Sequence, residues 1–285
     1  MGAANGVAAI QAPANKAAPF FSFGVIADVQ YADIPDGRSF YGVPRYYRHS
    51  LAVLRRAVTS WNNTQTQPGG VSFCINFGDI VDRHCPKDKS LSAVREVLDA
   101  FGELAGGRPT YHMLGNHCLY NLPQSSSSTR TTSARWAGPR TTRQPRRHCG
   151  SSKRTTPTPT RTAPTGSPAP PGASWRTTAA SARGEKVVVC GHLPMDPGAA
   201  FPESLLWNYN EVMGVVHRYG CVKACFAGHD HQGGYCVDSH GVHHRALEAA
   251  LECPPGTSAF GRVEVYRDRL VLVGSDRMAN TEMRF

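Results

Sequence analysis

Five short apolar stretches, each followed at once by polar residues or by Gly and then polar residues, constrain this sequence more than any other feature. Such stretches are typical of buried strands because they are short and apolar throughout. Residues with helical spacing of apolar side chains lie between several of them, and alternating strands and helices favour an α/β layered fold. In such folds ligands bind where the strands end. The five stretches end at Ala27, Phe77, Leu114, Cys190 and Ala227.

The periodicity of the apolar residues gives the expected elements. We predict strands over residues 20–27, 71–77, 110–114, 186–190 and 222–227. Helices are predicted over residues 47–61, 91–104 and 205–219. Residues 233–273 are expected to form antiparallel strands, with turns at Asp238-Ser239 and at Pro254-Pro255-Gly256.

Residues 124–184 interrupt this pattern. They hold 11 Lys and Arg residues, no Asp or Glu, and no Ile, Leu, Val, Phe or Met. Such a segment cannot bury enough apolar surface to offset the entropy of ordering, so we expect it to be disordered. Residues 20–123 and 185–285 are interpreted as the two halves of one domain. Residues 1–19 are interpreted as a flexible leader, because they lack the basic and apolar regions of a secretory signal.

The net charge and the length of the apolar runs argue against two kinds of partner, and the cysteine content indicates a compartment. The net charge is +10, but outside the basic segment there are 20 basic and 21 acidic residues, so a general nucleic-acid-binding face is not expected. No apolar run approaches the roughly 18 residues that cross a bilayer, so no membrane partner is expected either. Nine cysteines without a Cys-x-x-Cys pair favour a reducing compartment, and we expect a cytoplasmic monomer.

The polar residues that follow the five stretches are of the kinds that bind divalent metals. Carboxylate, amide oxygen and imidazole suit Mn, Fe, Mg or Zn. Taken singly, each residue is more simply explained as a turn cap or a surface histidine. The ordered set Asp-x-Gln, Gly-Asp-x-x-Asp, Gly-Asn-His, Gly-His and Gly-His-x-His together favours a metal site. Its members are Asp28, Gln30, Asp79, Asp82, Asn116, His117, His192, His229 and His231.

This ordered set resembles the signature of the calcineurin-like metallophosphoesterases, with Gln30 where many members carry His. Four stretches are more narrowly similar to the manganese-dependent ADP-ribose/CDP-alcohol diphosphatases, and to the plant members in particular. They are residues 28–33, 45–50, 206–209 and 228–235. The likeness covers residues 20–121 and 185–285. It implies a sandwich of two sheets flanked by helices, and hydrolysis of a diphosphate bond in ADP-ribose or a CDP-alcohol.

The resemblance also implies two divalent metal ions, manganese or otherwise Fe, Zn or Mg, about 3.5–4 Å apart. Asp79 would bridge them, and a water between the ions would become the hydroxide that attacks phosphorus. His117 would stabilise or protonate the leaving oxygen, and Asn116 belongs with it to the catalytic set. Asp82 would orient His117, or else only cap the following turn. The two coordination shells would be completed by Asp28, Gln30 and His231 and by Asn116, His192 and His229.

Two departures from the family leave other functions open. Cys118 stands where the family pattern Gly-Asn-His-Glu has Glu, and residues 124–184 stand where the family has folded strands. That segment resembles a coding region read in the wrong frame or across a mispredicted exon boundary, with a genuine basic insertion as the alternative. The other functions are a phosphomonoesterase or phosphodiesterase on the same metal core, a catalytically dead family member and, least supported, nucleic-acid binding by the basic segment. No residue is assigned to substrate binding.

Overall fold

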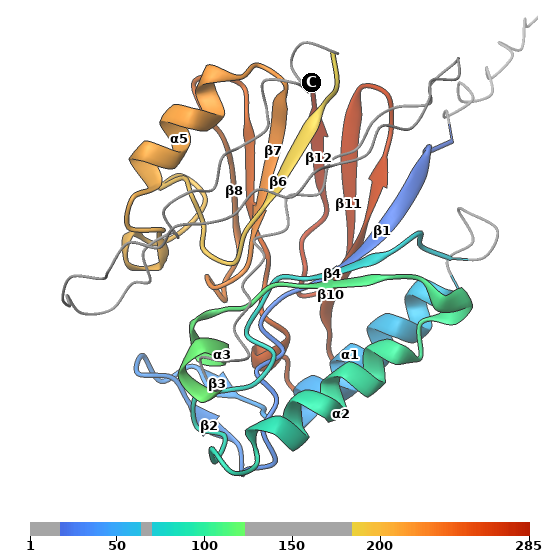
Figure 1. Cartoon of the computed structure of the whole chain (residues 1–285), viewed down its shortest axis with the longest axis vertical. Helices are drawn as coiled ribbons and strands as arrows, with labels where there is room; N and C mark the ends of the chain where they lie inside the picture. The colour runs from blue at the N-terminus through green and yellow to red at the C-terminus, as the bar shows by residue number, and fades with distance from the viewer. Residues whose placement is uncertain (1–17, 64–69, 123–183) are drawn as a thin grey trace, which may run out of the picture.

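The computed structural model describes residues 18–63, 70–122 and 184–285. Two β-sheets pack face to face, and helices cover their outer faces (Figure 1). This is the predicted sandwich of two sheets flanked by helices, and the fold class is confirmed. The flexible leader and the disordered basic segment were predicted for residues that, apart from 18, 19 and 184, lie outside the described ranges.

The larger sheet has six strands. Its strands β1, β4 and β5 are parallel, whereas β10, β11 and β12 extend the sheet from β1 as successive antiparallel pairs. In spatial order the strands are β12 (Thr281–Arg284), β11 (Arg269–Asp276), β10 (Ala259–Val265), β1 (Phe21–Ile26), β4 (Cys74–Asn76) and β5 (Thr110–His112). The parallel strands therefore bring the first three polar loops to one edge of this sheet.

The smaller sheet has four strands, in the order β6 (Val187–Cys190), β7 (Val222–Ala227), β9 (His243–Ala246) and β8 (Gly234–Val237). β6, β7 and β9 are parallel, and β8 and β9 form an antiparallel hairpin. The prediction of antiparallel strands alone after residue 233 is therefore wrong for β9, because this strand also pairs with β7. A separate ribbon joins β2 (Gly37–Arg38) to β3 (Pro44–Arg45).

The helices are α1 (His49–Asn62), α2 (Ser90–Gly102), α3 (Asn116–Asn121) and α5 (Tyr209–Arg218), with single 3-10 turns at Ala105–Gly107, Pro202–Ser204 and Ala250–Glu252. α1 and α2 lie on the larger sheet and α5 lies on the smaller one (Figure 1). α5 begins four residues later than predicted because Leu205 is still extended after the 3-10 turn. α3 was not predicted, since six residues are too few to reveal a helical period.

Apolar side chains fill the space between the sheets and the space under the helices. Phe23, Val25 and Phe77 of the larger sheet meet Phe226 of the smaller sheet in the central layer. On the opposite face of β1, Gly24 allows Trp61 of α1 to approach the backbone, because an added Cβ would lie 2.6 Å from the indole ring. Such close packing holds the strands, and with them the loops at their ends, in fixed positions.

Strands β5 and β6 lie at sheet edges on either side of the break in the described chain, and each has a described neighbour on one side only. The absence of core strands that the composition predicts concerns residues 124–184, which lie outside the described ranges apart from residue 184. No helix in the described ranges is long and apolar enough to span a membrane.

Candidate metal centre

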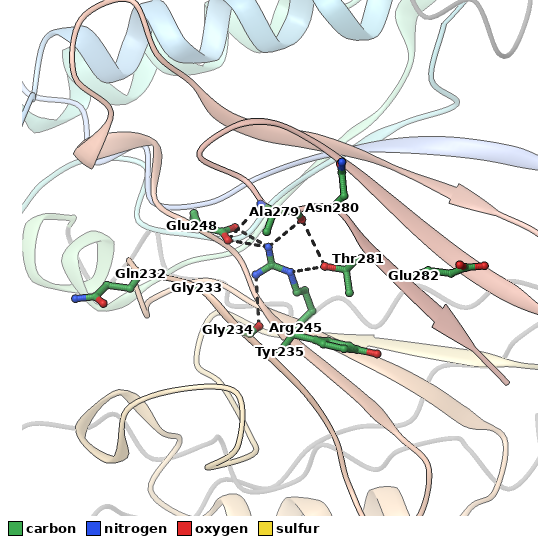
Figure 2. Close-up of a pocket in the computed structure, with 10 residues that line it drawn as sticks. All are labelled: Gln232, Gly233, Gly234, Tyr235, Arg245, Glu248, Ala279, Asn280, Thr281 and Glu282. Carbon is green, nitrogen blue, oxygen red and sulfur yellow. Dashed lines mark hydrogen bonds and ion pairs between the residues drawn. The ribbon is translucent and has the colours of Figure 1, made fainter.

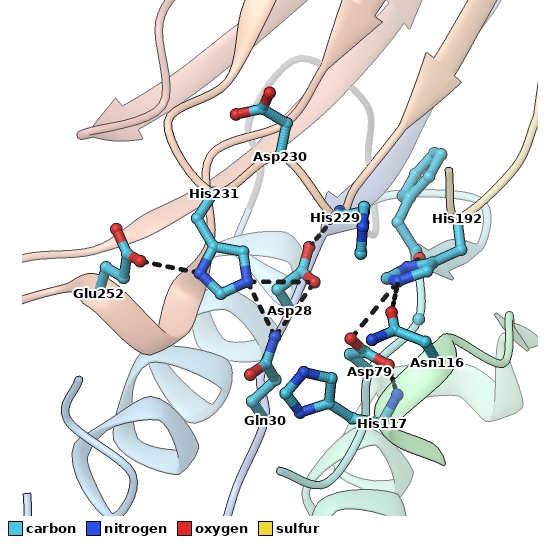
Figure 3. Close-up of polar contacts among 12 residues, drawn as sticks. Asp28, Gln30, Asp79, Asn116, His117, His192, His229, Asp230, His231 and Glu252 are labelled. Atoms are coloured by element: carbon cyan, nitrogen blue, oxygen red, sulfur yellow. Dashed lines mark hydrogen bonds and ion pairs between the residues drawn. The ribbon is translucent and has the colours of Figure 1, made fainter. Parts of the chain in front are cut away.

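The predicted ligands meet at the edge of the sandwich where the parallel strands end (Figure 3). Asp28, Gln30 and Asp79 have no exposed surface, so solvent does not compensate their polar atoms. The loops after β1, β4, β5, β6 and β7 supply, in this order, Asp28 with Gln30, Asp79, Asn116, His192, and His229 with His231.

Four of these residues have left-handed backbone conformations, which non-glycine residues adopt only at a cost. The φ angle is 51° at Asp28, 42° at Gln30, 49° at Asp79 and 66° at His229. Elsewhere in the described chain only Asp276 is a non-glycine residue with positive φ. Strain concentrated in this way is typical of pre-organised sites, where the surrounding fold fixes the direction of each side chain.

One half of the site joins Asp28, Gln30 and His231. Gln30 Nε2 lies 2.9 Å from His231 Nε2 and 3.4 Å from Asp28 Oδ1, and His231 Nε2 lies 3.6 Å from Asp28 Oδ1. On the far side of the ring, His231 Nδ1 is 2.8 Å from Glu252 Oε1. Glu252 therefore holds the Nδ1 proton and turns Nε2 toward the other ligands, the usual arrangement of a metal-binding histidine.

Sequence reasoning missed Glu252. The residue lies 21 positions after its partner, in the 3-10 turn Ala250–Glu252, and no motif or spacing marks it. Only the packing of this turn against the loop after β7, where the Ala249 N–H donates to the carbonyl of His231 at 3.1 Å, brings the carboxylate behind the imidazole.

The other half of the site joins Asp79, Asn116, His192 and His229. His192 Nε2 is 3.2 Å from Asn116 Oδ1 and 3.4 Å from Asp79 Oδ2. One ligand atom each of Asp79, His192 and His229 lies within 4.8 Å of the other two. His192 Nδ1 is 2.7 Å from the carbonyl oxygen of Phe77, and this bond directs Nε2 toward the site.

Two fully buried oxygens in the centre accept no hydrogen bond from any residue that the structure describes: Asp79 Oδ2 and Gln30 Oε1. Leaving such an atom unsatisfied costs about 1–3 kcal/mol, and more where the atom is charged. Divalent cations would satisfy both atoms, and carboxylate, amide oxygen and imidazole donors suit Mn, Fe, Zn or Mg. The residues present therefore fit a divalent metal centre with Asp79 between its two halves.

The charges in the site favour a cation. Burial alone would raise the pKa of Asp28, but the hydrogen bond and charge of His231 hold it well below its usual range. Burial would lower the pKa of His231 and of His192, yet the carboxylates beside them raise these values to about 10 and about 9. Burial and the nearby His192 lower the pKa of His229 to about 4. Metal binding would therefore displace protons from His231 and His192.

A family model of the calcineurin-like phosphoesterases matches residues 21–233, a range that contains all seven predicted ligands. The chain belongs to this family. The manganese-dependent ADP-ribose/CDP-alcohol diphosphatase of Oryza sativa subsp. japonica is 50% identical, over 95% of this chain and 96% of the relative. The protein of the same name from Arabidopsis thaliana is 45% identical, over 93% and 97% of the two chains. The resemblance expected from the motifs is confirmed.

Two further comparisons bear on the calcineurin-like phosphoesterase fold and on the length of the chain. A dimetal phosphatase from Danio rerio has a TM-score of 0.71 and 26% identity, over 94% of this chain and 99% of that one. The alignment with the rice relative runs over 323 positions, more than the 285 residues of this chain. The rice protein therefore has residues without a counterpart here.

His117 lies beside the ligands, and its backbone N–H donates to Asp79 Oδ1 at 2.9 Å. Its ring atom Nδ1 has a donor and an acceptor as neighbours. The donor is the N–H of Arg83 at 2.9 Å, and the acceptor is Asp82 Oδ2 at 3.2 Å. The neutral ring accepts from Arg83, whereas the protonated ring donates to Asp82. Nε2 carries a proton in both states, as a group that protonates a leaving oxygen requires.

Asp82 makes the contacts of both roles considered for it, the orientation of His117 and the capping of the turn. Its Oδ1 accepts the N–H of His84 at 2.7 Å, which caps the turn, and its Oδ2 faces His117 and, at 3.7 Å, Arg45 Nη1. Burial would raise the pKa of Asp82, but its hydrogen bonds with His117 and with the N–H of His84 keep this pKa below its usual range. The carboxylate is therefore charged at neutral pH and can orient the protonated ring.

Cys118, which replaces the Glu of the family pattern, packs into the core under α1 and α2. It is fully buried, and its Sγ accepts the N–H of Ile80 at 3.1 Å. Burial raises the pKa of the thiol to about 11, so the side chain is neutral. In this position it supplies packing and one weak hydrogen bond, but no negative charge.

A cavity of about 460 Å³ opens beside the ligands. Tyr41, Arg45, Phe201 and Glu203 line it together with the metal-centre residues. Among the described lining residues Arg45 is the only Lys or Arg, and its Nε is buried without a hydrogen-bond partner. A volume of about 300–1,000 Å³ is usual for sites that bind small molecules.

A neighbouring cavity of about 340 Å³ is lined in part by a buried ion pair (Figure 2). Arg245 Nη2 donates to Glu248 Oε2 at 2.7 Å and Oε1 at 2.9 Å, and Arg245 Nε donates to Thr281 Oγ1 at 3.1 Å. These contacts join β9 of the smaller sheet to β12 of the larger one. Gly233 has a φ of 72°, and a Cβ there would lie 2.6 Å from the Glu248 carboxyl carbon, so glycine allows the turn after His231 to pack on this pair.

Proposed function

We propose that the chain is a metal-dependent hydrolase that cleaves the diphosphate bond of ADP-ribose or of CDP-alcohols. The observation that carries the proposal is the convergence of seven metal-binding side chains, with two buried oxygens left for cations, Asp79 Oδ2 and Gln30 Oε1. The names of the rice and Arabidopsis relatives, which cover nearly the whole chain, support the substrate class and manganese.

The two halves of the site would hold one ion each, and Asp79 would contact both. One half would consist of Asp28, Gln30 and His231, and the other of Asn116, His192 and His229. When bound, two divalent ions supply a deprotonated water as nucleophile and neutralise charge that develops on the phosphoryl oxygens. The strained backbone at Asp28, Gln30, Asp79 and His229 supports this assignment, because it fixes ligand directions before any ion binds.

The protein's own acid would be His117. Its Nε2 proton would pass to the oxygen that leaves phosphorus, while Asp82 stabilises the protonated ring through Nδ1. The Nε–H of Arg45, which has no partner among the described residues, would donate to a phosphate oxygen of the substrate, and Arg45 would thereby anchor the diphosphate in the cavity.

The test compares substrates at fixed manganese concentration. We expect ADP-ribose to yield AMP and ribose 5-phosphate, and a CDP-alcohol to yield CMP and the phosphorylated alcohol. The assay uses the chain as it is and a second protein in which residues 123–183 are replaced by the corresponding segment of the rice relative. Cleavage of p-nitrophenyl phosphate or a cyclic nucleotide, with no cleavage of either diphosphate, would assign the centre to a phosphomonoesterase or phosphodiesterase instead.

A replaced-segment protein that binds manganese but hydrolyses nothing would identify a catalytically dead family member.

The remaining expectations belong to the same proposal: a small-molecule substrate, no nucleic-acid or membrane partner, a monomer and a cytoplasmic location. The eight cysteines in the described ranges are free, which supports a reducing compartment.

A further inference from the structure

A second group of metal-binding side chains lies in the smaller sheet, apart from the seven ligands. Asp196 comes from the loop after β6, His217 from α5, Cys236 from β8, Asp238 from the hairpin turn and His244 from β9. We call these five residues the hairpin cluster. None of them belongs to the centre described above.

Contacts link the side chains of the hairpin cluster, and Cys236 joins the others through Asp196. Asp238 Oδ2 is 2.8 Å from His217 Nε2 and 3.0 Å from His244 Nε2. Asp196 Oδ2 is 4.0 Å from the same nitrogen of His244, and Asp196 Oδ1 accepts the thiol of Cys236 at 3.2 Å. One ligand atom each of Asp196, Asp238 and His244 lies within 4.8 Å of the other two. Four atoms around a tetrahedral zinc ion are about 3.3–3.8 Å apart, given bond lengths near 2.0–2.3 Å.

The cluster is well shielded from water. The side chains of His244 and Asp238 are 3% and 6% exposed, and that of Asp196 is 18% exposed. His244 Nδ1 is buried and has no hydrogen-bond partner in the described part of the chain. Two carboxylates in such a place need positive charge nearby, because a buried anion without a partner is costly.

Part of the cluster has an ordinary structural role. Asp238 Oδ1 accepts the N–H groups of His240 and Val242 at 2.8 and 3.0 Å, which shapes the turn between β8 and β9. That role uses one oxygen of Asp238. It does not explain why the other oxygen, Asp196, a thiol and two imidazoles from four separate elements point toward one another.

We propose that the hairpin cluster binds one structural zinc ion, through Asp196, Cys236, Asp238 and His244. His217 then donates to the coordinated Asp238 and holds its orientation, as a partner of a metal-binding carboxylate usually does. A site with nitrogen and sulfur donors favours zinc over manganese or magnesium, which prefer oxygen. Binding releases the thiol proton of Cys236 to water, so that the thiolate is the ligand.

The position of this zinc ion lets it stabilise the fold. It ties the loop that follows the ligand His192 to the β8–β9 hairpin and, through His217, to α5. Three residues separate His192 from Asp196. Zinc at the hairpin cluster therefore stabilises the half of the sandwich that begins at the sheet edge β6.

Cobalt(II) in place of zinc tests the proposal, because a cobalt–thiolate bond gives a charge-transfer band in the near ultraviolet. The seven ligands of the other centre include no cysteine, so this band reports the hairpin cluster alone. We expect the metal-free full-length protein to develop the band as cobalt is added until both centres are filled, at an intensity of one cobalt–thiolate bond per chain, and zinc to abolish it. The band should be lost in Cys236→Ser and retained in Asp79→Asn and in Cys85→Ser, a buried control cysteine.

Alkylation of Cys236 is an independent test of zinc binding. Among the eight cysteines in the described ranges Cys236 is the only one that is not buried, so iodoacetamide should modify it before the other seven and zinc should protect it. Mass spectrometry of the peptide that contains Cys236 separates its modification from that of Cys149, which lies outside the described ranges. In the Asp196→Asn variant we expect at least a tenfold loss of zinc protection with an unchanged circular dichroism spectrum. No cobalt–thiolate band, a band that survives Cys236→Ser, or alkylation of Cys236 that zinc does not slow would each overturn the proposal.

Discussion

At the scale of single residues, Asp79 is the side chain on which both halves of the metal centre depend. Its Oδ1 accepts the N–H of His117, and its Oδ2 is buried without a hydrogen bond. Gly115 allows this carboxylate to lie against the next strand end, because a Cβ at Gly115 would be 2.1 Å from Asp79 Oδ1. The carboxylate therefore has a fixed position, and its Oδ2, which faces His192 Nε2 at 3.4 Å, accepts no hydrogen bond from the described residues, as a bridging ligand requires.

We expect Asp79→Asn to abolish hydrolysis and to lower bound manganese, because a neutral amide cannot neutralise two cations. His117→Ala should slow turnover and leave the metal content near normal, since His117 is assigned no coordination. Elemental analysis and activity assays on the two variants check this. Two metals retained in Asp79→Asn would contradict the bridging role, and metal lost from His117→Ala would contradict the division between ligand and acid.

Asp82→Asn tests the orientation of His117. The amide can still accept the N–H of His84, but it cannot stabilise a protonated ring, so we expect kcat to fall about 10–100-fold with metal content and KM nearly unchanged. Asp33→Asn, which removes a carboxylate that is 76% exposed, is the control. An unchanged kcat in Asp82→Asn would mean that Asp82 only caps its turn.

At the scale of secondary-structure elements, the two sheets depend on contacts that cross between them. Arg245 of β9 is 2% exposed, and its guanidinium is saturated by Glu248, Thr281 and backbone carbonyls. Breaking a buried pair from one side leaves an uncompensated charge. The turn after His231 packs on the same pair, so the damage reaches the metal centre.

Glu248→Gln should lower the free energy of unfolding by about 3–5 kcal/mol, because Arg245 stays buried without a charged partner. Breaking the exposed pair between Glu282 and Arg284, whose side chain is 70% exposed, should cost less than about 1 kcal/mol in Arg284→Gln. Urea unfolding of the two variants measures both values. Equal effects in the two variants would show that the buried pair has no special role.

His112 on β5 gives the larger sheet a dependence on pH. Its ring meets Phe101 of α2 edge-on at 4.9 Å, and burial lowers its pKa from 6.5 to about 4. Between these values the unfolded chain binds a proton that the folded chain does not. Stability is therefore complete above pH 6.5 and falls by up to about 1.4 kcal/mol per pH unit as pH drops toward 4. Urea unfolding of His112→Gln should show a correspondingly weaker pH dependence, and an identical slope would contradict this.

At the scale of the whole molecule, both sheets have an edge strand beside the break in the described chain. β5 and β6 are edge strands in the described part, and Tyr111 of β5 and Leu119 of α3 are 41% and 40% exposed beside the break. Each large apolar side chain left uncovered forfeits about 1.5–3 kcal/mol, against a domain stability of about 5–15 kcal/mol. A few such losses are enough to unfold a domain.

We therefore expect the 285-residue chain to be poorly soluble, to be cleaved rapidly between residues 124 and 184, and to have little activity although every proposed ligand is present. Limited proteolysis combined with the ADP-ribose assay measures this. The protein with the rice segment in place of residues 123–183 is the matched control and should resist the protease. A compact, protease-resistant and active natural chain would show that the segment is a tolerated insertion.

Local sequence was sufficient for the parts of the molecule that depend on local physics. Buried strands are recognisable because they are short and apolar, and their ends at Ile26, Asn76 and Ala227 agree with the prediction within one residue. The ligands follow those ends directly, so they could be found without the fold. The start of α5 and the helix α3 were missed, since a 3-10 turn and a six-residue helix have no clear period.

The sequence by itself thus determined the α/β sandwich, the family and the seven candidate ligands, because each is encoded in neighbouring residues. Tertiary structure alone decided which partners these ligands have. Gln30 and His231 are 201 positions apart and their side-chain nitrogens lie 2.9 Å apart, while Glu252 orients His231 from the separate 3-10 turn Ala250–Glu252. The parallel pairing of β9 with β7 and the hairpin cluster also depend on packing between distant segments. The physical reason is that spacing along the chain fixes the direction of a side chain, whereas only the packed sheets fix which other side chain it meets.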